Sequence, residues 1–286
     1  MMKMWLSFLL LSILAEAGIY GLDDRQEAFA ISVASELKAL ARSVPAIIEK
    51  KVLISRLDGN FTPQGYSLSR MNFCREARFA EQQYVARCSS SLIAPNLVLT
   101  AGHCIDEDLP KWCREHTVVF DYAVGLGDKI IDKQNVYECQ EVVYRNFAMP
   151  FGEDLAIIRL KRNVEDRPLI RVSRDSLAPG QPLSMIGYPL GIPQKVVDDG
   201  EVLPGGDTAV SFRHNLDTFS SNSGGPIFAQ NGEQVGVLVR ATSPNQRNVA
   251  GRSCVDWGVA RETDYAEGNS LLHLSPVLGT LGISLL

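Results

Sequence analysis

The sequence lacks the features that would assign it to a special class of protein. Its 286 residues contain no internal repeat, no low-complexity segment and no long run of charges of one sign. With 45% apolar and 21% charged residues, the composition is that of a globular protein rather than a disordered, collagenous or coiled-coil one. The formal net charge of −5 argues against a phosphate-binding surface, so nucleic acid is not an expected partner.

Long hydrophobic runs are missing after the first 17 residues. Residues 1–17 read MMKMWLSFLLLSILAEA, in which Lys3 precedes an apolar run of about ten residues and Ala15-Glu16-Ala17 has the small-x-small form of a signal-peptidase site. The run is too short to cross about 30 Å of hydrocarbon, which favours a cleaved signal peptide over an uncleaved membrane anchor. We therefore expect a secreted or periplasmic protein with no stable membrane insertion.

Motifs for metal binding by cysteine are also missing. The six cysteines contain no C-x-x-C pair, and apart from His103-Cys104 no cysteine adjoins a histidine. An even number of cysteines in an exported chain is typical of disulfide bonds, so we expect disulfides and no metal site.

Residues 18–72 differ from the rest of the chain in their pattern of apolar and polar residues. Within residues 23–42, apolar residues recur at steps of three and four behind leading acidic residues, which predicts an amphipathic helix that ends by Pro45. A mixed polar stretch with Gly and Pro loop signals follows. This region is either a helical extension packed on the main domain or a pro-segment removed in maturation, which would make the chain a zymogen.

From residue 73 to residue 286 the pattern changes to short apolar runs separated by turn residues. The runs are rich in β-branched and aromatic residues, which is typical of an all-β sandwich or barrel. Examples are 96–101, 117–124, 136–144, 154–160, 181–188 and 233–241. Only the tail, 270–281, has a pattern that allows a short helix. The chain is thus divided into a signal peptide (1–17), an N-terminal extension (18–72) and one β-rich domain (73–286).

Three short stretches of this domain contain the residue types of acyl transfer. His103 lies at the end of LVLTAGHC, Asp154 opens DLAIIRL, and Ser223 lies in the turn SNSGGP. A serine hydroxyl is a weak nucleophile until a base takes its proton, and an acid must hold that base in the right tautomer. Each stretch alone has a structural explanation, but the order His, Asp, Ser in an exported β domain is far more specific.

Residues 88–104 (CSSSLIAPNLVLTAGHC), 154–160 and 217–228 (DTFSSNSGGPIF) together resemble the trypsin/chymotrypsin-like serine peptidases. Within that family the sequence is most similar to bacterial V8-like, or glutamyl endopeptidase-like, members, in which Asn precedes the nucleophile. The resemblance covers residues 73–286. It implies an all-β fold of two six-stranded antiparallel barrels, with the catalytic residues in the cleft between them.

The resemblance also implies a role for each motif residue. His103 matches the general base, Asp154 the carboxylate that orients it, and Ser223 the nucleophile of a serine endopeptidase that forms an acyl-enzyme. The backbone N–H groups of Ser221 and Ser223 would form the oxyanion hole, where one donor contributes roughly 3–4 kcal/mol. We expect protein or peptide substrates, no cofactor and a monomeric enzyme.

Two positions depart from the family pattern. Ser221 stands where the family usually has Gly, and a side chain there disfavours positive φ and would turn its N–H away from the oxyanion hole. This departure supports the alternative function, a catalytically impaired relative that uses the same cleft for binding. Asn222 replaces the Asp that pairs with a new N-terminal amine in animal trypsin-like enzymes, so we expect activity without that ion pair.

The residues that select the substrate side chain are left open by the sequence. Asp217 lies six residues before Ser223, where the trypsin-type pattern has an acid that selects Arg or Lys. In V8-like relatives that prefer acidic side chains, the position of Thr218 lines the pocket and the next strand carries a His. Residues 236–240 contain no His, and Arg240 would either meet an acidic side chain or lie on the surface.

The resemblance pairs Cys88 with Cys104. The other four cysteines allow three pairings. Cys113 precedes the run 117–124 and Cys139 lies within the run 136–144, and these two runs would form a hairpin, which leaves Cys74 with Cys254. Each bridge would contribute roughly 2–4 kcal/mol to stability.

The remaining histidines are weaker candidates for a functional role. We expect His116 and His273 at the surface or in packing. His214 is expected to be structural, with a place beside the substrate pocket as the alternative. A non-peptidase esterase has no motif in its favour, because G-x-S-x-G is absent.

Overall fold

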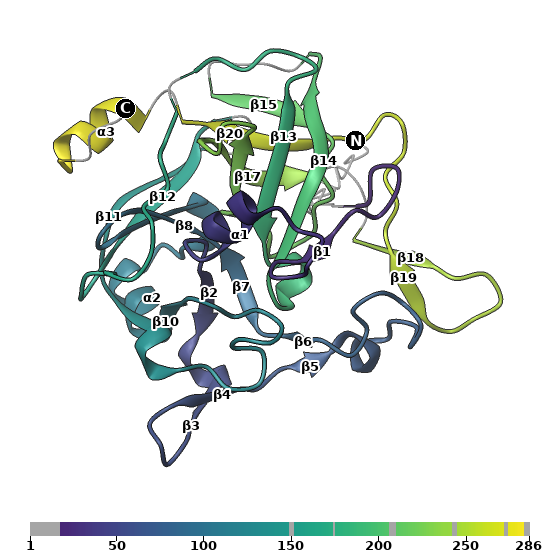
Figure 1. Cartoon of the computed structure of the whole chain (residues 1–286), viewed down its shortest axis with the longest axis horizontal. Helices are drawn as coiled ribbons and strands as arrows, with labels where there is room; N and C mark the ends of the chain where they lie inside the picture. Colours follow the sequence, from purple (N-terminus) through teal and green to yellow (C-terminus); the bar gives the residue numbers. More distant parts are fainter. Residues whose placement is uncertain are drawn as a thin grey trace, which may run out of the picture.

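The computed structural model describes residues 18–148, 152–173, 175–205, 210–241, 245–271 and 274–282; the predicted signal peptide and His273 lie outside them. Most strands belong to two seven-stranded sheets with antiparallel pairing throughout, which lie side by side in Figure 1. Among the described residues, no helix has the length and apolar character needed to cross a membrane.

The first sheet closes into a nearly complete barrel. Its strands, in spatial order, are β7 (Ala86–Ser89), β2 (Ala46–Glu49), β10 (His116–Val119), β11 (Val136–Phe147), β12 (Asp154–Leu160), β9 (Leu97–Thr100) and β8 (Ser91–Ala94). Only Ser90 separates β7 from β8, so one bent segment pairs with β2 at one edge and with β9 at the other. Counted as one strand, this segment makes the barrel six-stranded.

The second sheet is a closed barrel with one added edge strand. Its strands, in spatial order, are β1 (Gln26–Glu27), β14 (Lys195–Leu203), β13 (Pro182–Gly187), β16 (Pro226–Ala229), β17 (Gln234–Ala241), β20 (Ala266–Ser270) and β15 (Ser211–His214). The pairing of β14 with β15 closes a ring of six strands, to which β1 adds a short seventh. The predicted fold of two six-stranded antiparallel barrels is confirmed.

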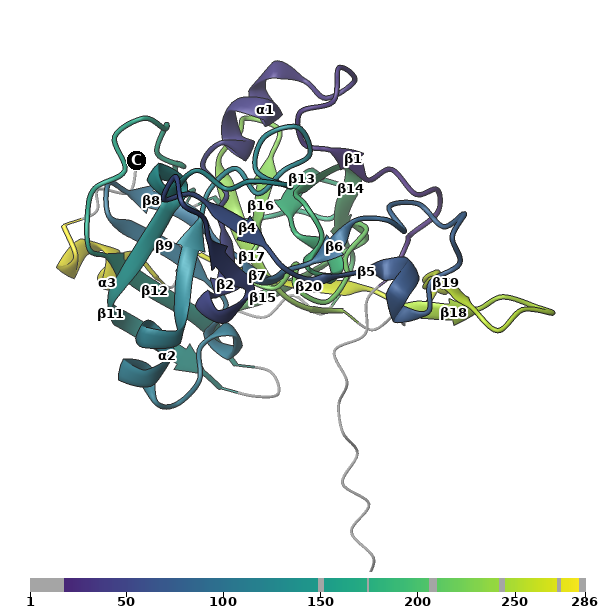
Figure 2. The ribbon, with the colours of Figure 1, turned by 90° about the horizontal axis from the view of Figure 1, so that it is seen from below.

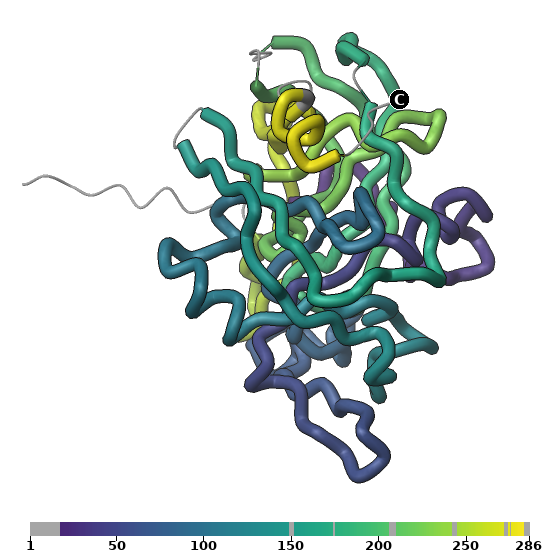
Figure 3. Tube along the Cα trace, turned by 90° about the vertical axis from the view of Figure 1, so that its left-hand side faces the viewer, coloured from purple at the N-terminus to yellow at the C-terminus, as the bar shows by residue number. Residues whose placement is uncertain are grey.

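Three two-stranded ribbons and short helices decorate the barrels. The ribbons are β3 (Leu53–Ser55) with β4 (Phe61–Pro63), β5 (Tyr66–Ser67) with β6 (Gln83–Tyr84), and β18 (Gln246–Asn248) with β19 (Val255–Trp257). The α-helices are α1 (Ser35–Ala41), α2 (Leu109–Glu115) and α3 (Ser275–Thr280), and the 3₁₀ helices are η1 (Lys50–Val52), η2 (Leu68–Met71), η3 (Gly102–Cys104), η4 (Lys133–Asn135) and η5 (Pro189–Gly191). Figure 2 shows the β18–β19 ribbon projecting from the body of the molecule, and Figure 3 shows the β3–β4 ribbon projecting at the bottom of the view.

The motifs that contain His103 and Asp154 lie at the ends of strands with continuous apolar sequence. β12 is buried on both faces, since Leu155, Ala156 and Ile157 are each 0% exposed. Its hydrophobic cluster continues into Leu274 and Leu278 around α3, the short C-terminal helix that the sequence allowed. Because burial of such runs fixes their register, the side chains at the strand ends take fixed places.

Residues 18–72 take part in both barrels. β2 lies between β7 and β10 in the first sheet, and β1 pairs with β14 in the second. The expected boundary at residue 73 therefore coincides with no edge of either sheet. Of the helix predicted over 23–42, only α1 is present. Ile31, an apolar residue of the predicted helix, is 100% exposed, whereas Arg25 is fully buried.

Three disulfides join Cys74 to Cys254, Cys88 to Cys104 and Cys113 to Cys139. All three expected pairings are present. Cys74–Cys254 ties the β18–β19 ribbon to the segment before β6, and Cys88–Cys104 ties β7 to η3.

Candidate active site

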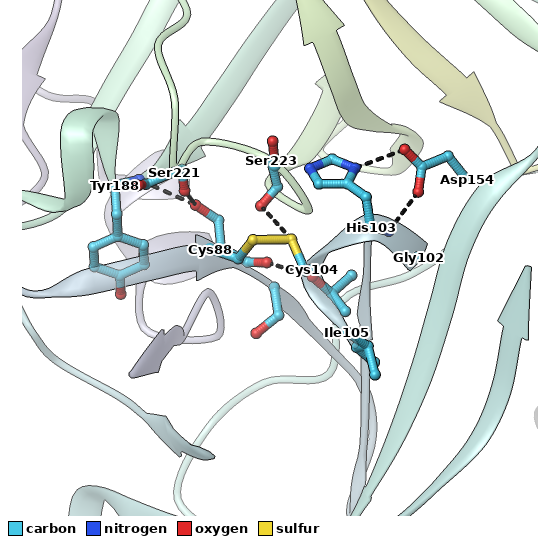
Figure 4. The surroundings of a disulfide bond; sticks show 12 residues. Cys88, Gly102, His103, Cys104, Ile105, Asp154, Tyr188, Ser221 and Ser223 are labelled. Carbon is cyan, nitrogen blue, oxygen red and sulfur yellow. Dashed lines mark hydrogen bonds and ion pairs between the residues drawn. A yellow bond between two sulfur atoms is a disulfide. The ribbon is translucent and has the colours of Figure 1, made fainter. Parts of the chain in front are cut away.

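His103 and Asp154 form a close pair at the ends of two adjacent strands. η3, which carries His103, follows β9, and β9 pairs with β12, whose first residue is Asp154. The Nδ1 atom of His103 lies 2.6 Å from Oδ2 of Asp154, and the backbone N–H of His103 donates to Oδ1 over 2.8 Å. Both carboxylate oxygens therefore hold the same residue, and they fix both the backbone and the ring of His103 (Figure 4).

Glycine at position 102 permits this close approach. A Cβ atom on Gly102 would collide with the carbonyl oxygen of Asn146 and would lie 3.1 Å from Oδ1 of Asp154. Any side chain at this position would push η3 away from β11 and β12. The Gly-His pair in the motif is therefore a packing requirement of the His103–Asp154 contact.

Asn269 is a buried partner of Asp154 that the sequence did not reveal. Its Oδ1 accepts the backbone N–H of Asp154 over 2.6 Å, and its side chain is fully buried. Asn269 lies in β20 of the second barrel, so this hydrogen bond joins the two barrels directly behind the carboxylate. The only signal in the sequence is an Asn in the apolar-flanked stretch AEGNSLL, which has no distinctive spacing.

Ser223 lies on the other side of the His103 ring from Asp154. Figure 4 shows its side chain beside the ring edge that carries Nε2, while Nδ1 faces the carboxylate. The carbonyl of Ser223 accepts the N–H of Ser89 over 2.8 Å, which anchors the serine loop to β7. Gly224 follows at φ +83°, and a Cβ atom there would collide with Thr100 and Ser89, so this position accepts only glycine.

The Cys88–Cys104 disulfide lies beneath this group of residues (Figure 4). These two sulfurs and His103 are also a cluster of potential metal ligands. Because each sulfur is bonded to the other, neither is available as a thiolate, the form in which cysteine binds metals.

Ser221 adopts the left-handed backbone conformation that a side chain at this position disfavours. Its φ is +69°, and the N–H of Asn222 donates to the carbonyl of Phe219 over 3.0 Å. A turn with positive φ at its third position has the form of type II, which favours Gly there, and a left-handed non-glycine residue costs roughly 1–2 kcal/mol. Within the described ranges, neither the Ser221 nor the Ser223 N–H donates to another protein group.

Asn222, between these two serines, is 1% exposed. Its Oδ1 has no hydrogen-bond partner among the described residues. An uncharged side chain occupies this buried position, where an Asp would require a cation.

Asp217 and Thr218 are covered by the start of the described chain. The carboxylate of Asp217 accepts the N–H of Tyr20 over 2.7 Å, and the N–H of Thr218 donates to the carbonyl of Gly18 over 3.2 Å. Asp217 is 2% exposed and Thr218 is 0% exposed. Burial raises the pKa of the Asp217 carboxyl to about 8, although the Tyr20 N–H acts in the opposite direction.

Arg25 extends this covering segment into an aromatic cage. Its guanidinium lies 3.8 Å from the ring centre of Trp257 and 4.5 Å from that of Phe219, and it pairs with Asp23 over 2.7 Å. Phe219 directly follows Thr218 in the serine loop. The N-terminal segment therefore packs against the loop through main-chain and side-chain contacts.

Arg240 pairs with a neighbour in its own sheet. It lies opposite Glu267 in the β17–β20 ladder, and the two side chains form an ion pair. The structure thus brings His103, Asp154 and Ser223 together but gives Asp217 and Arg240 internal partners.

The two described histidines outside this group are packing residues. His116 is 4% exposed and stacks on Trp112 at a ring distance of 4.7 Å. His214 is fully buried, its Nδ1 accepts the N–H of Leu216, and burial lowers its pKa to about 3. His214 is therefore neutral at physiological pH and fits its expected structural role.

Two antiparallel barrels with a His–Asp pair on one and a serine loop on the other define a trypsin-like fold. The sequence matches the trypsin-like peptidase domain family over residues 88–237, slightly more than half of the chain, and the chain belongs to this family.

Two solved structures share the fold. One is the Vibrio cholerae VesB protease, with a TM-score of 0.53, 14% identity and coverage of 91% of this chain and 67% of that one. The other is a Glu endopeptidase in complex with MPD, with a TM-score of 0.54, 16% identity and coverage of 92% of this chain and 98% of that one. A search of curated proteins found no match.

Proposed function

We propose that the protein is an exported serine endopeptidase that cleaves peptide bonds through an acyl-enzyme. The observation that carries this proposal is the position of the His103 imidazole, with Asp154 at Nδ1 and Ser223 at the opposite edge. A serine hydroxyl is activated when a base faces it and a carboxylate holds that base in one tautomer.

The first half of the reaction makes the acyl-enzyme. Nδ1 of His103 is occupied by Asp154, so Nε2 takes the Ser223 proton while Oγ attacks the scissile carbonyl carbon. The tetrahedral intermediate then breaks its C–N bond, and the imidazolium returns the proton to the leaving amine. Asp154 stabilises the imidazolium during both transfers.

The second half releases the product. Water loses a proton to His103 and attacks the ester carbon, and the C–Oγ bond breaks as the proton returns to Ser223. In both halves the N–H groups of Ser221 and Ser223, which have no acceptor among the described residues, would bind the oxyanion. These steps use protein groups and water.

We also propose that residues 18–72 remain in the mature enzyme. Removing them would take β2 from the middle of the first sheet and β1 from the second. Cleavage after Ala17 would instead leave Gly18, which pairs with Thr218, as the first residue. The three disulfides suit an oxidising compartment outside the cytoplasm.

The geometry offers no charged pocket residue that would select the substrate side chain on the N-terminal side of the scissile bond. Asp217 is bound by backbone N–H groups of the N-terminal segment, and Arg240 is paired with Glu267. We therefore propose that this subsite accepts uncharged side chains. A peptide library that varies this residue tests the idea, and strict preference for Arg, Lys or Glu would overturn it.

The test of the main proposal is covalent labelling of the secreted full-length product by a fluorophosphonate probe, together with casein hydrolysis. We expect both in the wild type and neither in Ser223→Ala. Ser253→Ala, an exposed serine in the β18–β19 ribbon, is the matched control and should behave like the wild type. A folded wild type that neither labels nor cleaves would instead support a binding protein.

A further inference from the structure

The peptide between Ser220 and Ser221 carries the oxyanion donor of the proposed reaction. In a planar trans peptide the C=O and the N–H point in opposite directions. Fixing the Ser220 carbonyl therefore fixes the direction of the Ser221 N–H. The inference below rests on the proposed function, because it concerns this donor.

Ser220 is held at three of its polar atoms. Its N–H donates to Oδ1 of Asn245 over 2.9 Å, its Oγ accepts from Nδ2 of the same Asn245 over 2.8 Å, and its carbonyl accepts the N–H of Leu190 over 2.7 Å. Asn245 is itself anchored, since its carbonyl accepts the N–H of Gly258 over 3.0 Å at the base of the β18–β19 ribbon. The clamp thus comes from two segments far from Ser220 in sequence.

The next residue is held on its far side. Oγ of Ser89 donates to the carbonyl of Ser221 over 3.0 Å and accepts the N–H of Tyr188 over 3.1 Å. The peptides before and after the Ser221 Cα are therefore both tied to the barrels.

We propose that Asn245 is a positioning residue that keeps the Ser221 N–H directed into the oxyanion hole. Serine at position 221 makes such a clamp necessary. Rotation of the 220–221 peptide by about half a turn converts a type II turn into type I and brings φ of the third residue to about −90°, where serine is unstrained. The rotation breaks the Leu190 bond and points the Ser221 N–H away from the nucleophile. A relative with glycine at this position would have no such strain and no need of the clamp.

Asn245→Ala removes both side-chain bonds to Ser220 and tests the proposal by steady-state kinetics on a peptide ester or amide. We expect kcat to fall by about tenfold or more, with KM within about twofold, because the lost interaction is made with the transition state. Asn248→Ala, an exposed Asn three residues further along the same ribbon, is the matched control and should retain the wild-type kcat.

Rescue separates positioning from a general structural role. In Asn245→Ala/Ser221→Gly the third turn residue is no longer strained. The kcat of this double variant should therefore lie close to that of Ser221→Gly alone and above that of Asn245→Ala. A merely destabilised ribbon would not be repaired by a change at position 221. A wild-type kcat in Asn245→Ala, or a double variant as slow as Asn245→Ala, would overturn the proposal.

Crystal structures of the same variants give a readout that needs no activity. In Asn245→Ala the Ser220 carbonyl should leave the Leu190 N–H and φ of Ser221 should become negative, while the double variant should keep the wild-type turn. If the wild type shows no Ser223-dependent turnover, the proposed function fails, and the turn in these structures still decides whether Asn245 positions the peptide. An unchanged turn in Asn245→Ala overturns the inference.

Discussion

The two halves of the candidate site are held in different ways. In the first barrel, His103 and Asp154 bond directly to each other at the ends of paired strands. In the second barrel, the serine loop is held by Leu190 and Asn245. One half thus consists of a direct pair on its own sheet with one supporting contact from Asn269, whereas the other depends mainly on segments that approach it from elsewhere in the chain.

This difference indicates where the site is robust and where it can be adjusted. A pair at the ends of paired strands is constrained by the strand ladder and by the Asn269 hydrogen bond behind it. A loop clamped by single side chains can change conformation while both barrels stay folded, so its substitutions should affect catalysis more than stability. Residues 18–72, which contribute strands to both barrels, give the strongest test of this contrast.

A chain that begins at residue 73 removes that shared segment and should not fold. It lacks β2, whose Ile47 and Ile48 are 0% exposed, and leaves β7 and β10 without their common neighbour. We expect no cooperative thermal transition by circular dichroism and no turnover. A chain that begins at Gly18 is the control and should unfold cooperatively. A folded, active chain from residue 73 would show that residues 18–72 are dispensable and would restore the pro-segment hypothesis.

Asp154→Asn should give the largest catalytic effect within a folded barrel. The amide can retain the hydrogen bonds but favours the wrong imidazole tautomer, and in a serine triad this costs about 10⁴-fold in kcat. Thermal stability should change far less than in the truncation. Asp166→Asn, at a side chain 59% exposed, is the control for removal of one carboxylate. A kcat within tenfold of the wild type would contradict the role of Asp154.

Asn269→Ala tests the contact by which the second barrel supports the first. Its loss leaves the buried N–H of Asp154 without an acceptor and lets the carboxylate shift. We expect kcat to fall by about tenfold with little change in KM, since small misplacements of catalytic groups reduce the rate. In Asn269→Asp an oxygen acceptor remains, so this variant should retain more activity. Equal kcat values for the wild type and Asn269→Ala would remove Asn269 from the site.

The motifs revealed most of the first half of the site because its determinants are local. His103 follows a continuous apolar run and Asp154 begins another. The same runs therefore predicted both the strands and the positions of these two residues at the strand ends. For the same reason the apolar runs named from the sequence overlap β9, β10, β11, β12, β13 and β17, whereas β14, β15, β16 and β20 were not among them. The family resemblance paired Cys88 with Cys104, proximity of two runs paired Cys113 with Cys139, and elimination left Cys74 with Cys254.

The contacts of the second half could not be read in this way. The sequence identified Ser223 and the unusual Ser221, but the sign of φ at Ser221 is decided by contacts with Leu190, Asn245 and Ser89. β2 was missed because its short run AIIE follows Pro45 in a region that otherwise has a helical and polar texture. Such pairings join remote segments, and neither propensity nor spacing records them.

Asp217 provides a smaller test, on the contact between the N-terminal segment and the serine loop. Its pKa is raised to about 8 when folded, against about 3.9 when unfolded. At a pH between these two pKa values, Asp217 is protonated in the folded state and ionised in the unfolded state. The free energy of unfolding therefore falls as pH rises, by up to about 1.4 kcal/mol per pH unit.

His214 sets the pH window in which this effect is visible. Its pKa is lowered to about 3, so below about pH 6.5 the unfolded state binds a proton that the folded state refuses, and stability rises with pH. From about pH 4 to 6.5 the two slopes oppose each other. From about pH 6.5 to 8 the rising slope of His214 has ended and the falling slope of Asp217 remains.

Asp217→Asn should remove that slope. The amide oxygen can still accept the Tyr20 N–H, and no proton is lost on unfolding. Urea unfolding at pH 6.5 and at pH 8 should show the variant gaining about 1–2 kcal/mol on the wild type across this interval. Asp166→Asn should follow the wild-type curve. Parallel curves for Asp217→Asn and the wild type would mean that Asp217 is ionised when folded, and its charge would then be available to balance the buried Arg25 or a basic substrate side chain.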